Sequence, residues 1–560
     1  MSTVTRPHIS PPRLIDWRGP HSATPSQPSR TPRHFIRRRL ALAAGLLLAV
    51  IAIAAAAVWG MSGSDEIPPA TGAAALVPAD ALAYLNLSID SGRPVVADAR
   101  TLAARFPDWP LLETAALNRL RTIVAGSSAV PADFAGAVRP WIGKEAALAL
   151  ISSGASGAIE PLVVLAVARP TRAQAFVRFA GASAAGAYDG ARLEAYPTGS
   201  ELAFVGHYLV AGSATGVRAA IDAAAGRARK LSRDPAYDRA VAGEPADRVL
   251  DAYLSATGVH ELLATRTRVG GAIGLLLDRP SLQGTAISVS PTATGARVLV
   301  HSVLGATAPV RSFTPTLQSV LPSGSTLMLD VDGLDRAAPA LLEATATAGI
   351  AANVGPLLQR VGTALRSQGV NLRSVLSLFD GETAVALGPG TTPSLVIVAR
   401  VQHQATAQGE LAALEGPVTG MFSASGSGPG QVPELADQDI GGVAVHEIAL
   451  GPGLQVDYGV WDGLVVVSTS LRLIDDVFAR EHSLDGDPGY RATLPDQPGP
   501  LSSLVFGDVS RLLALGEQTG LTSGARTREL VPDLSQVHAI GLSSTSGERD
   551  TTTELNLQIP

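Results

Sequence analysis

The order of apolar and polar residues along the chain predicts short strands with helices between some of them. Apolar residues alternate with other residues over 82–87 and 327–331, which is the spacing of a strand with one buried face. Continuous apolar runs at 161–167 and 464–467 are typical of strands that are buried on both faces. Helical spacing occurs in three further segments: 172–180, 215–225 and 472–479.

Two serines mark places where a predicted strand ends and a predicted helix begins. Ser213 and Ser470 both stand at such a junction. A serine hydroxyl there accepts a hydrogen bond from a helix amide that has no other partner, so we expect both residues to be N-caps. The segment 423–430 is rich in Gly, Ser and Pro and is expected to be a loop.

The longest apolar run, residues 40–61, predicts a transmembrane helix. It contains no charged residue, and as a helix it would be about 33 Å long, enough for a hydrocarbon core of about 30 Å. Arg37 to Arg39 stand directly before it, and Trp59 lies where an interfacial aromatic residue is expected. A cleaved export signal is the alternative, but the run is longer than the apolar part of such signals.

Charge is distributed unevenly about this segment. Residues 1–39 carry eight arginines and one acidic residue, Asp16, whereas the rest carries 35 basic and 48 acidic residues. Basic residues beside a membrane helix mark its cytoplasmic side. We therefore expect a bacterial cell-membrane protein with a cytoplasmic N-terminus and an extracytoplasmic bulk, and the acidic bulk argues against nucleic-acid binding.

The remainder of the chain shows an internal duplication. Five segments of the first half match five segments of the second half in the same order. The matched pairs are 77–88 with 321–332, 141–150 with 378–387, 161–169 with 393–401, 208–222 with 464–477, and 234–241 with 487–494. A single match of this kind would be weak evidence, but five matches in the same order predict two copies of one fold.

These patterns together predict an α+β fold: a single N-terminal transmembrane helix followed by two tandem copies of a mixed, mainly antiparallel sheet with helices on one face. The expected domains are a disordered basic cytoplasmic tail at 1–39, the membrane helix at 40–61, a linker at 62–74, and ectodomain repeats at 75–305 and 316–560.

Three stretches resemble one bacterial family. They are LVPADALAYLNL at 76–87, RFPDWP at 105–110 and DFAGAVRPWIGKEAALAL at 133–150. The chain resembles, over most of residues 75–560, the uncharacterised membrane-anchored family catalogued as domain of unknown function 3352. Because no activity is established for that family, the resemblance implies no catalytic residues.

A search for catalytic and metal-binding motifs finds none. The chain has no cysteine, which excludes disulfides, thiol nucleophiles and Cys-ligated metals. His446 begins the sequence HEIAL, but Leu450 stands where a zinc motif needs a second histidine. No S-x-x-K, G-x-S-x-G or phosphate-binding loop is present. We therefore assign no catalytic, cofactor-binding or metal-binding residue.

Two sets of acidic residues were weighed as candidate sites. Asp330, Asp332 and Asp335 loosely resemble a calcium loop, but the spacing is wrong, and a strand end that leads into a capped helix is the favoured interpretation. Glu145 and Glu382 occupy matching places in the two copies and could form an acid–base pair. We expect instead that both are surface charges at the start of a strand, since unpaired carboxylates are rarely buried.

The sequence leaves three functions open. The first is a non-catalytic binding or envelope-associated module, which would contact the bilayer through residues 40–61 and a partner or ligand of the envelope. The second is an extracytoplasmic hydrolase that uses distant carboxylates, and the third is a carrier for an apolar molecule. A closed core with no polar cleft would favour the first, convergent buried carboxylates the second, and a large apolar cavity the third.

Overall fold

The structure is a computed structural model that describes residues 68–124, 134–153, 158–263, 281–305, 311–334, 377–389, 394–422, 434–451, 454–495, 499–520 and 524–560. The basic tail, the predicted membrane helix at 40–61 and the predicted loop at 423–430 lie outside these residues. None of the helices in the described ranges is long and apolar enough to cross a membrane.

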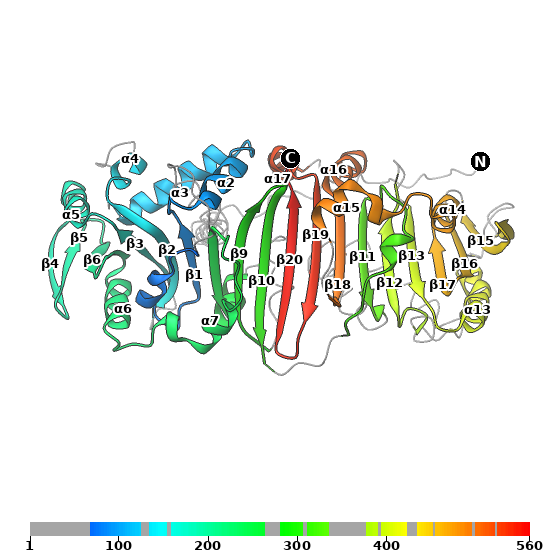
Figure 1. The fold of residues 1–560 in the computed structure, drawn as a ribbon, viewed down its shortest axis with the longest axis horizontal. Helices are drawn as coiled ribbons and strands as arrows, with labels where there is room; N and C mark the ends of the chain where they lie inside the picture. Colours follow the sequence, from blue (N-terminus) through cyan, green and yellow to red (C-terminus); the bar gives the residue numbers. More distant parts are fainter. Residues whose placement is uncertain are drawn as a thin grey trace, which may run out of the picture.

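Twenty strands of the described residues form one sheet that runs the length of the molecule (Figure 1). The first half contributes β1 (Ala83–Ser88), β2 (Ile142–Ser153), β3 (Ala158–Val167), β4 (Ser183–Tyr188), β5 (Ala191–Ala195), β6 (Glu201–Val205), β7 (Tyr208–Gly212), β8 (Leu250–Ser255), β9 (Leu282–Thr292) and β10 (Gly295–Leu304). The second half contributes β11 (Leu327–Asp332), β12 (Glu382–Leu387), β13 (Leu395–Arg400), β14 (Glu434–Ile440), β15 (Val443–Gly451), β16 (Leu454–Trp461), β17 (Leu464–Ser468), β18 (Ser503–Asp508), β19 (Ala539–Ser546) and β20 (Asp550–Gln558).

The strands of the two halves follow the same order from the outer edge to the centre. In the first half this order is β4-β5-β6-β7-β3-β2-β1-β8-β9-β10. In the second half it is β14-β15-β16-β17-β13-β12-β11-β18-β19-β20. The last strand of each half, β10 and β20, then pair with each other, antiparallel and side by side at the centre of Figure 1. Antiparallel pairing of equivalent strands relates the halves by an approximate two-fold axis.

The two halves also carry helices between their strands, and several of them lie at matching places. Those of the first half are η2 (Gly72–Leu76), α2 (Pro94–Ala103), α3 (Trp109–Val124), α4 (Phe134–Val138), α5 (Pro170–Phe179), α6 (Ala214–Ala224), η4 (Leu231–Arg233), α7 (Pro235–Ala240) and α8 (Ala256–Leu263). Those of the second half are η5 (Leu317–Ser319), α13 (Gln404–Phe422), α14 (Leu471–Ala479), η7 (Leu484–Gly486), α15 (Pro488–Thr493), α16 (Val509–Gln518) and α17 (Ala525–Leu534).

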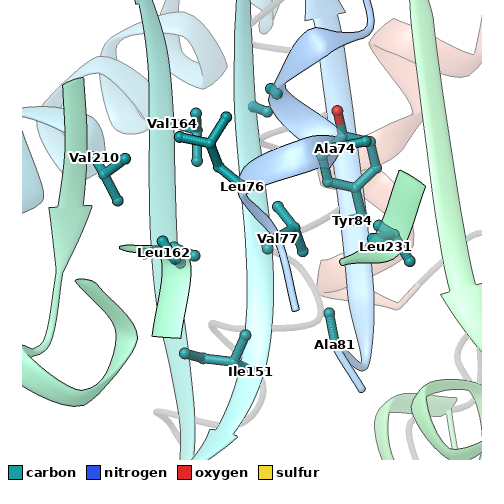
Figure 2. Close-up of a cluster of buried hydrophobic side chains, with 14 of the residues drawn as sticks. Ala74, Leu76, Val77, Ala81, Tyr84, Ile151, Leu162, Val164, Val210 and Leu231 are labelled. Atoms are coloured by element: carbon teal, nitrogen blue, oxygen red, sulfur yellow. The ribbon is translucent and has the colours of Figure 1, made fainter. Parts of the chain in front are cut away.

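Helices cover both faces of the sheet because several strands carry apolar side chains on both. In β3, Leu162 and Val164 pack toward α6, η4 and α7, while Val163 and Leu165 pack toward α3, α4 and α5. Figure 2 shows the first of these two cores, in which Leu76 of η2 and Leu231 of η4 lie over the sheet. The second half repeats this core beneath α14 and α15.

The predicted fold class is therefore wrong in its arrangement. We expected two mixed, mainly antiparallel sheets with helices on one face, but every strand pairing found here is antiparallel, both halves share one sheet, and helices lie on both faces. The error has a physical cause. Alternation along a strand shows that one of its faces is buried, but it does not show that the edge strands of two copies will pair.

Most of the elements predicted from local patterns are confirmed within a few residues. β1, β3, β11 and β17 cover the four predicted strands, and α5, α6 and α14 cover the predicted helices. Ser213 is an N-cap whose hydroxyl accepts a hydrogen bond from the Gly216 amide at 3.1 Å. Ser470 stands at the N-cap position of α14 but makes no such bond, so its predicted capping bond is wrong.

Candidate binding cavity at the junction of the two halves

The junction between β10 and β20 presents a polar surface on the side that α7 and α15 cover. Leu299 pairs with Glu554, and His301 pairs with Thr552, so these side chains share one face of the sheet. The neighbouring strands continue these rows with Ser288 on β9 and Ser543 on β19. This row of side chains is far more polar than the cores on either side of it, as expected where a ligand rather than another element is to be bound.

A cavity of about 590 Å³ lies on this face, on the side of the first half. Its wall comes from α7 and the loop after it, its floor from β9 and β10, and its far side from the β19–β20 turn and β20. The lining residues are Arg239, Ala242, Gly243, Glu244, Ala286, Ser288, Leu299, His301, Val303, Arg549, Asp550 and Thr552. The size is within the range of small-molecule sites, and we call it the seam cavity.

Glu244 is the most unusual group in this lining. Its side chain is only 5% exposed, and its Oε1 atom has no hydrogen-bond partner among the described residues. Its Oε2 atom lies 3.0 Å from Nε of Arg248, which also lies 3.2 Å from Oδ1 of Asp251. One buried arginine therefore serves two buried carboxylates.

Burial sets the protonation of this cluster. Burial, with repulsion from Asp251, raises the pKa of Glu244 to about 8, although Arg248 acts in the opposite direction. Burial also raises the pKa of Asp251 to about 6, against the effect of Arg248 and Asn86. At neutral pH Asp251 is therefore mostly ionised, while the protonated form of Glu244 is favoured.

The loop that carries Glu244 is held by polar contacts on both sides. Asp247 accepts hydrogen bonds from Ser290 of β9 and Arg297 of β10, at 3.0 and 2.9 Å. Arg93 donates to the carbonyl oxygens of Ala246 and Arg248, at 2.7 and 2.9 Å. These bonds tie the loop to two strands of the floor and to the start of α2, so the cavity wall is well positioned for binding.

His301 occupies the middle of the cavity floor. Its Nδ1 atom lies 2.9 Å from the carbonyl oxygen of Ala240, which can only accept, so this nitrogen carries a proton. Its Nε2 atom lies 3.7 Å from Oδ2 of Asp550. The ring is therefore oriented by α7 on one side and by β20 on the other, and it links the two halves.

Two arginines stand at the cavity rim. Arg239 donates from Nη2 to Oε1 of Gln283 at 2.6 Å and from Nε to the Pro235 carbonyl oxygen at 3.0 Å. Arg549 lies in the turn between β19 and β20 and pairs with no carboxylate among the described residues. Neither guanidinium is neutralised by a carboxylate in this part of the chain, so the rim is suited to an anion.

Glu145 and Glu382, expected to be surface charges, are buried instead, with exposures of 2% and 8%. Glu145 accepts hydrogen bonds from the Tyr208 hydroxyl and, at 3.3 Å, from the Ala73 amide. Glu382 accepts from the Leu317 amide at 2.9 Å and from Arg400 at 3.0 Å. Each carboxylate thus binds the start of a 3-10 helix, η2 or η5, and both lie far along the sheet from the seam cavity.

The calcium-like acidic set is not brought together as a ligand cluster. Asp330 is fully buried in β11, and burial, followed by repulsion from Glu382, raises its pKa to about 8. Asp332 ends the strand and lies 4.0 Å from Arg311, and Asp335 lies outside the described residues. The capped helix expected after this strand stays a prediction, because residues 335–376 lie outside the described part of the chain. No group of three or more metal-ligating side chains occurs among the residues described.

His446, the remaining sequence candidate, lies on β15 near the outer end of the sheet. Its Nδ1 atom lies 2.7 Å from Oδ1 of Asp437, and its ring stacks on Tyr458 at 4.8 Å between centroids. Its sequence neighbour Glu447 instead accepts from Gln438. The partners of His446 thus come from β14 and β16, and Oε1 of Glu415 on α13 lies 3.7 Å from its Nδ1 atom.

The sequence analysis missed the seam cavity entirely. Glu244, His301 and Arg549 are spread over more than three hundred residues of the chain and belong to no motif. The one signal that could have indicated them is the polar character of the strands now seen as β9, β19 and β20, where Ser and Thr replace the apolar alternation of other strands. Only the pairing of β10 with β20 brings these residues together.

Comparison with other proteins gives little beyond the family. No curated protein matches this chain. Two crystal forms of the protein TP0453, forms III and I, are 11% identical to it over 45% and 43% of this chain and 84% and 82% of theirs. Their TM-score is 0.26, which carries no argument about fold or function. The sequence model of the family described as "Protein of unknown function (DUF3352)" matches residues 40–559, and the chain belongs to that family.

Proposed function

We propose that this protein is a membrane-tethered, extracytoplasmic and non-catalytic binding module whose small-molecule ligand occupies the seam cavity. The apolar segment 40–61 and the arginines before it support the tether and its orientation. The seam cavity is the observation that carries the binding role, because its lining joins apolar side chains to two rim arginines that pair with no carboxylate in the described part of the chain.

The alternatives fit the cavity less well. An apolar molecule would contact Ala286, Leu299 and Val303, but it would offer no hydrogen bond to the polar side chains of the same lining. A hydrolase has one specific observation in its favour: a carboxyl group that keeps its proton at neutral pH is suited to act as a general acid. Hydrolysis of chromogenic esters or glycosides by the full chain, lost in E244Q, would support this second candidate over the first.

The tether is tested by membrane topology. A reporter enzyme that is active only outside the cytoplasm should be active when it is fused after Pro560. The same reporter inserted before the apolar segment, after Arg30, should be inactive. A well-expressed but silent fusion at Pro560 would contradict the orientation.

The cavity is tested by filling it. The full chain in lipid nanodiscs should show a higher unfolding temperature with at least one of hydroxyhexanoate, hexanediol and hexanediamine, because a ligand stabilises the state that binds it. L299W should abolish this increase, since the indole enters the cavity. V298W is the matched control, because neighbouring side chains of a strand point to opposite faces. If no probe stabilises the protein, or if L299W responds like the wild type, the cavity is not the site.

A further inference from the structure

We infer that the seam cavity takes a small organic anion, whose carboxylate or phosphate group lies at Arg239 and Arg549 and whose hydrocarbon part lies along the floor toward Leu299. This inference rests on the binding function proposed above. It adds the chemical class and the orientation of the ligand, neither of which follows from the presence of a cavity.

The two arginines lie at the same end of the cavity. Arg239 binds Gln283, which lies on β9 where that strand pairs with the end of β10. The carbonyl oxygen of Arg549 accepts a hydrogen bond from Leu304, the last residue of β10, at 2.7 Å. Both side chains are therefore near the Val303 end of the floor.

Glu244 lies at the opposite end. Through Arg248 it is joined to Asp251, and Asp251 pairs across the sheet with Ser288, which pairs with Leu299. Leu299 and Val303 are four residues apart on β10, which corresponds to roughly 13 Å along the strand at about 3.3 Å per residue. The cavity is thus elongated, with the two arginines at one end and the buried Glu244 at the other.

The charge of the lining favours an anion over a cation. Of the two lining carboxyl groups, Glu244 is held by Arg248, and Asp550 is 54% exposed and lies beside His301. Arg239 and Arg549 therefore keep a positive charge at the rim that no carboxylate of the described residues pairs with. Ala286, Leu299 and Val303 lie between the two ends and provide apolar contact for a short hydrocarbon chain.

A six-carbon probe series tests the inference by isothermal titration of the full chain in nanodiscs. Hydroxyhexanoate and hexyl phosphate represent the two anionic groups, and hexanediol and hexanediamine are the neutral and cationic controls. At least one anionic probe should bind ten-fold or more tightly than either control. R549Q should weaken its binding about ten-fold, as expected for loss of a charge-assisted hydrogen bond, while R172Q, a change at an exposed arginine of α5, should leave it unchanged.

If only one of hydroxyhexanoate and hexyl phosphate binds, the result supports the inference and identifies the anionic group of the ligand. Equal or tighter binding of hexanediol or hexanediamine overturns the anionic class but leaves the binding function intact. Anion binding that R549Q does not weaken overturns the assigned orientation. The absence of binding by all four probes overturns both the inference and the proposed function.

Discussion

The two halves of this protein have the same strand order but different buried chemistry at equivalent positions. In the first half, Asn86 lies at the centre of β1, where its amide donates to the Ala70 carbonyl oxygen at 2.8 Å. In the second half the equivalent position of β11 is Asp330, which is equally buried and keeps its proton at neutral pH. A neutral carboxyl group in one copy thus occupies the place of a neutral amide in the other.

Glu145 and Glu382, which occupy matching positions in the two halves, also differ in their side-chain partners. Glu145 is held by Tyr208 of β7, whereas the residue equivalent to Tyr208 is Leu464, and Glu382 is held instead by Arg400 of β13. The backbone role is the same in both copies, because each carboxylate binds an amide of η2 or η5. The comparison teaches that the fold requires a carboxylate that accepts from the 3-10 helix, whereas the side chain that holds this carboxylate can differ.

The largest expected effect on stability comes from exchanging the residue types at the equivalent positions Asn86 and Asp330. Because the folded-state pKa of Asp330 is raised to about 8, the folded protein holds a proton that the unfolded chain releases above about pH 4. The unfolding free energy therefore falls as the pH rises between these values, by about 1.4 kcal/mol per pH unit. D330N should remove this dependence and gain about 4 kcal/mol relative to the wild type between pH 5 and pH 8.

The reciprocal change, N86D, is the control for this prediction. It removes the donor to Ala70 and places a second carboxyl group beside Asp251, so its stability should fall as the pH rises. Denaturant unfolding of the full chain at several pH values measures both. Parallel pH profiles for D330N and the wild type would show that Asp330 is ionised in the folded state.

Removing the glutamates should have a smaller and unequal effect. E382A leaves the Thr316 and Leu317 amides without their acceptor and Arg400 without its partner, and should lower the unfolding free energy by about 3 kcal/mol. E145A loses the bonds from Tyr208 and Ala73 and should lower it by about 1–2 kcal/mol. Denaturant unfolding at pH 7 ranks the two variants, and a larger loss for E145A would reverse the comparison.

The smallest expected difference lies at the helix caps. S213A removes the bond to the Gly216 amide and should lower the unfolding free energy by about 1 kcal/mol. S470A removes no capping bond, so its effect should be close to zero. Thermal unfolding of both variants side by side provides the measurement, and equal losses would mean that Ser470 caps α14 after all.

The sequence predicts local elements well and the candidate site poorly. Strands β1 and β11 and the cap at Ser213 follow from patterns a few residues long, which local sterics and hydrogen bonds determine. The burial of Glu145 and Glu382 could not be predicted, since it depends on η2 and η5 lying over the sheet. The seam cavity needs Glu244 and Arg549 together, and the polar residues of β20 do not show that this strand pairs with β10.

The most direct test of the account is the pairing of β10 with β20, since the single sheet and the seam cavity both depend on it. Leu299 and Glu554 lie directly opposite each other, and the chain has no cysteine of its own. The double variant L299C/E554C should form an intramolecular disulfide on mild oxidation, because opposed residues of antiparallel strands lie within disulfide range. Failure to form this bond, with L299C/S543C cross-linking instead, would contradict the joined sheet.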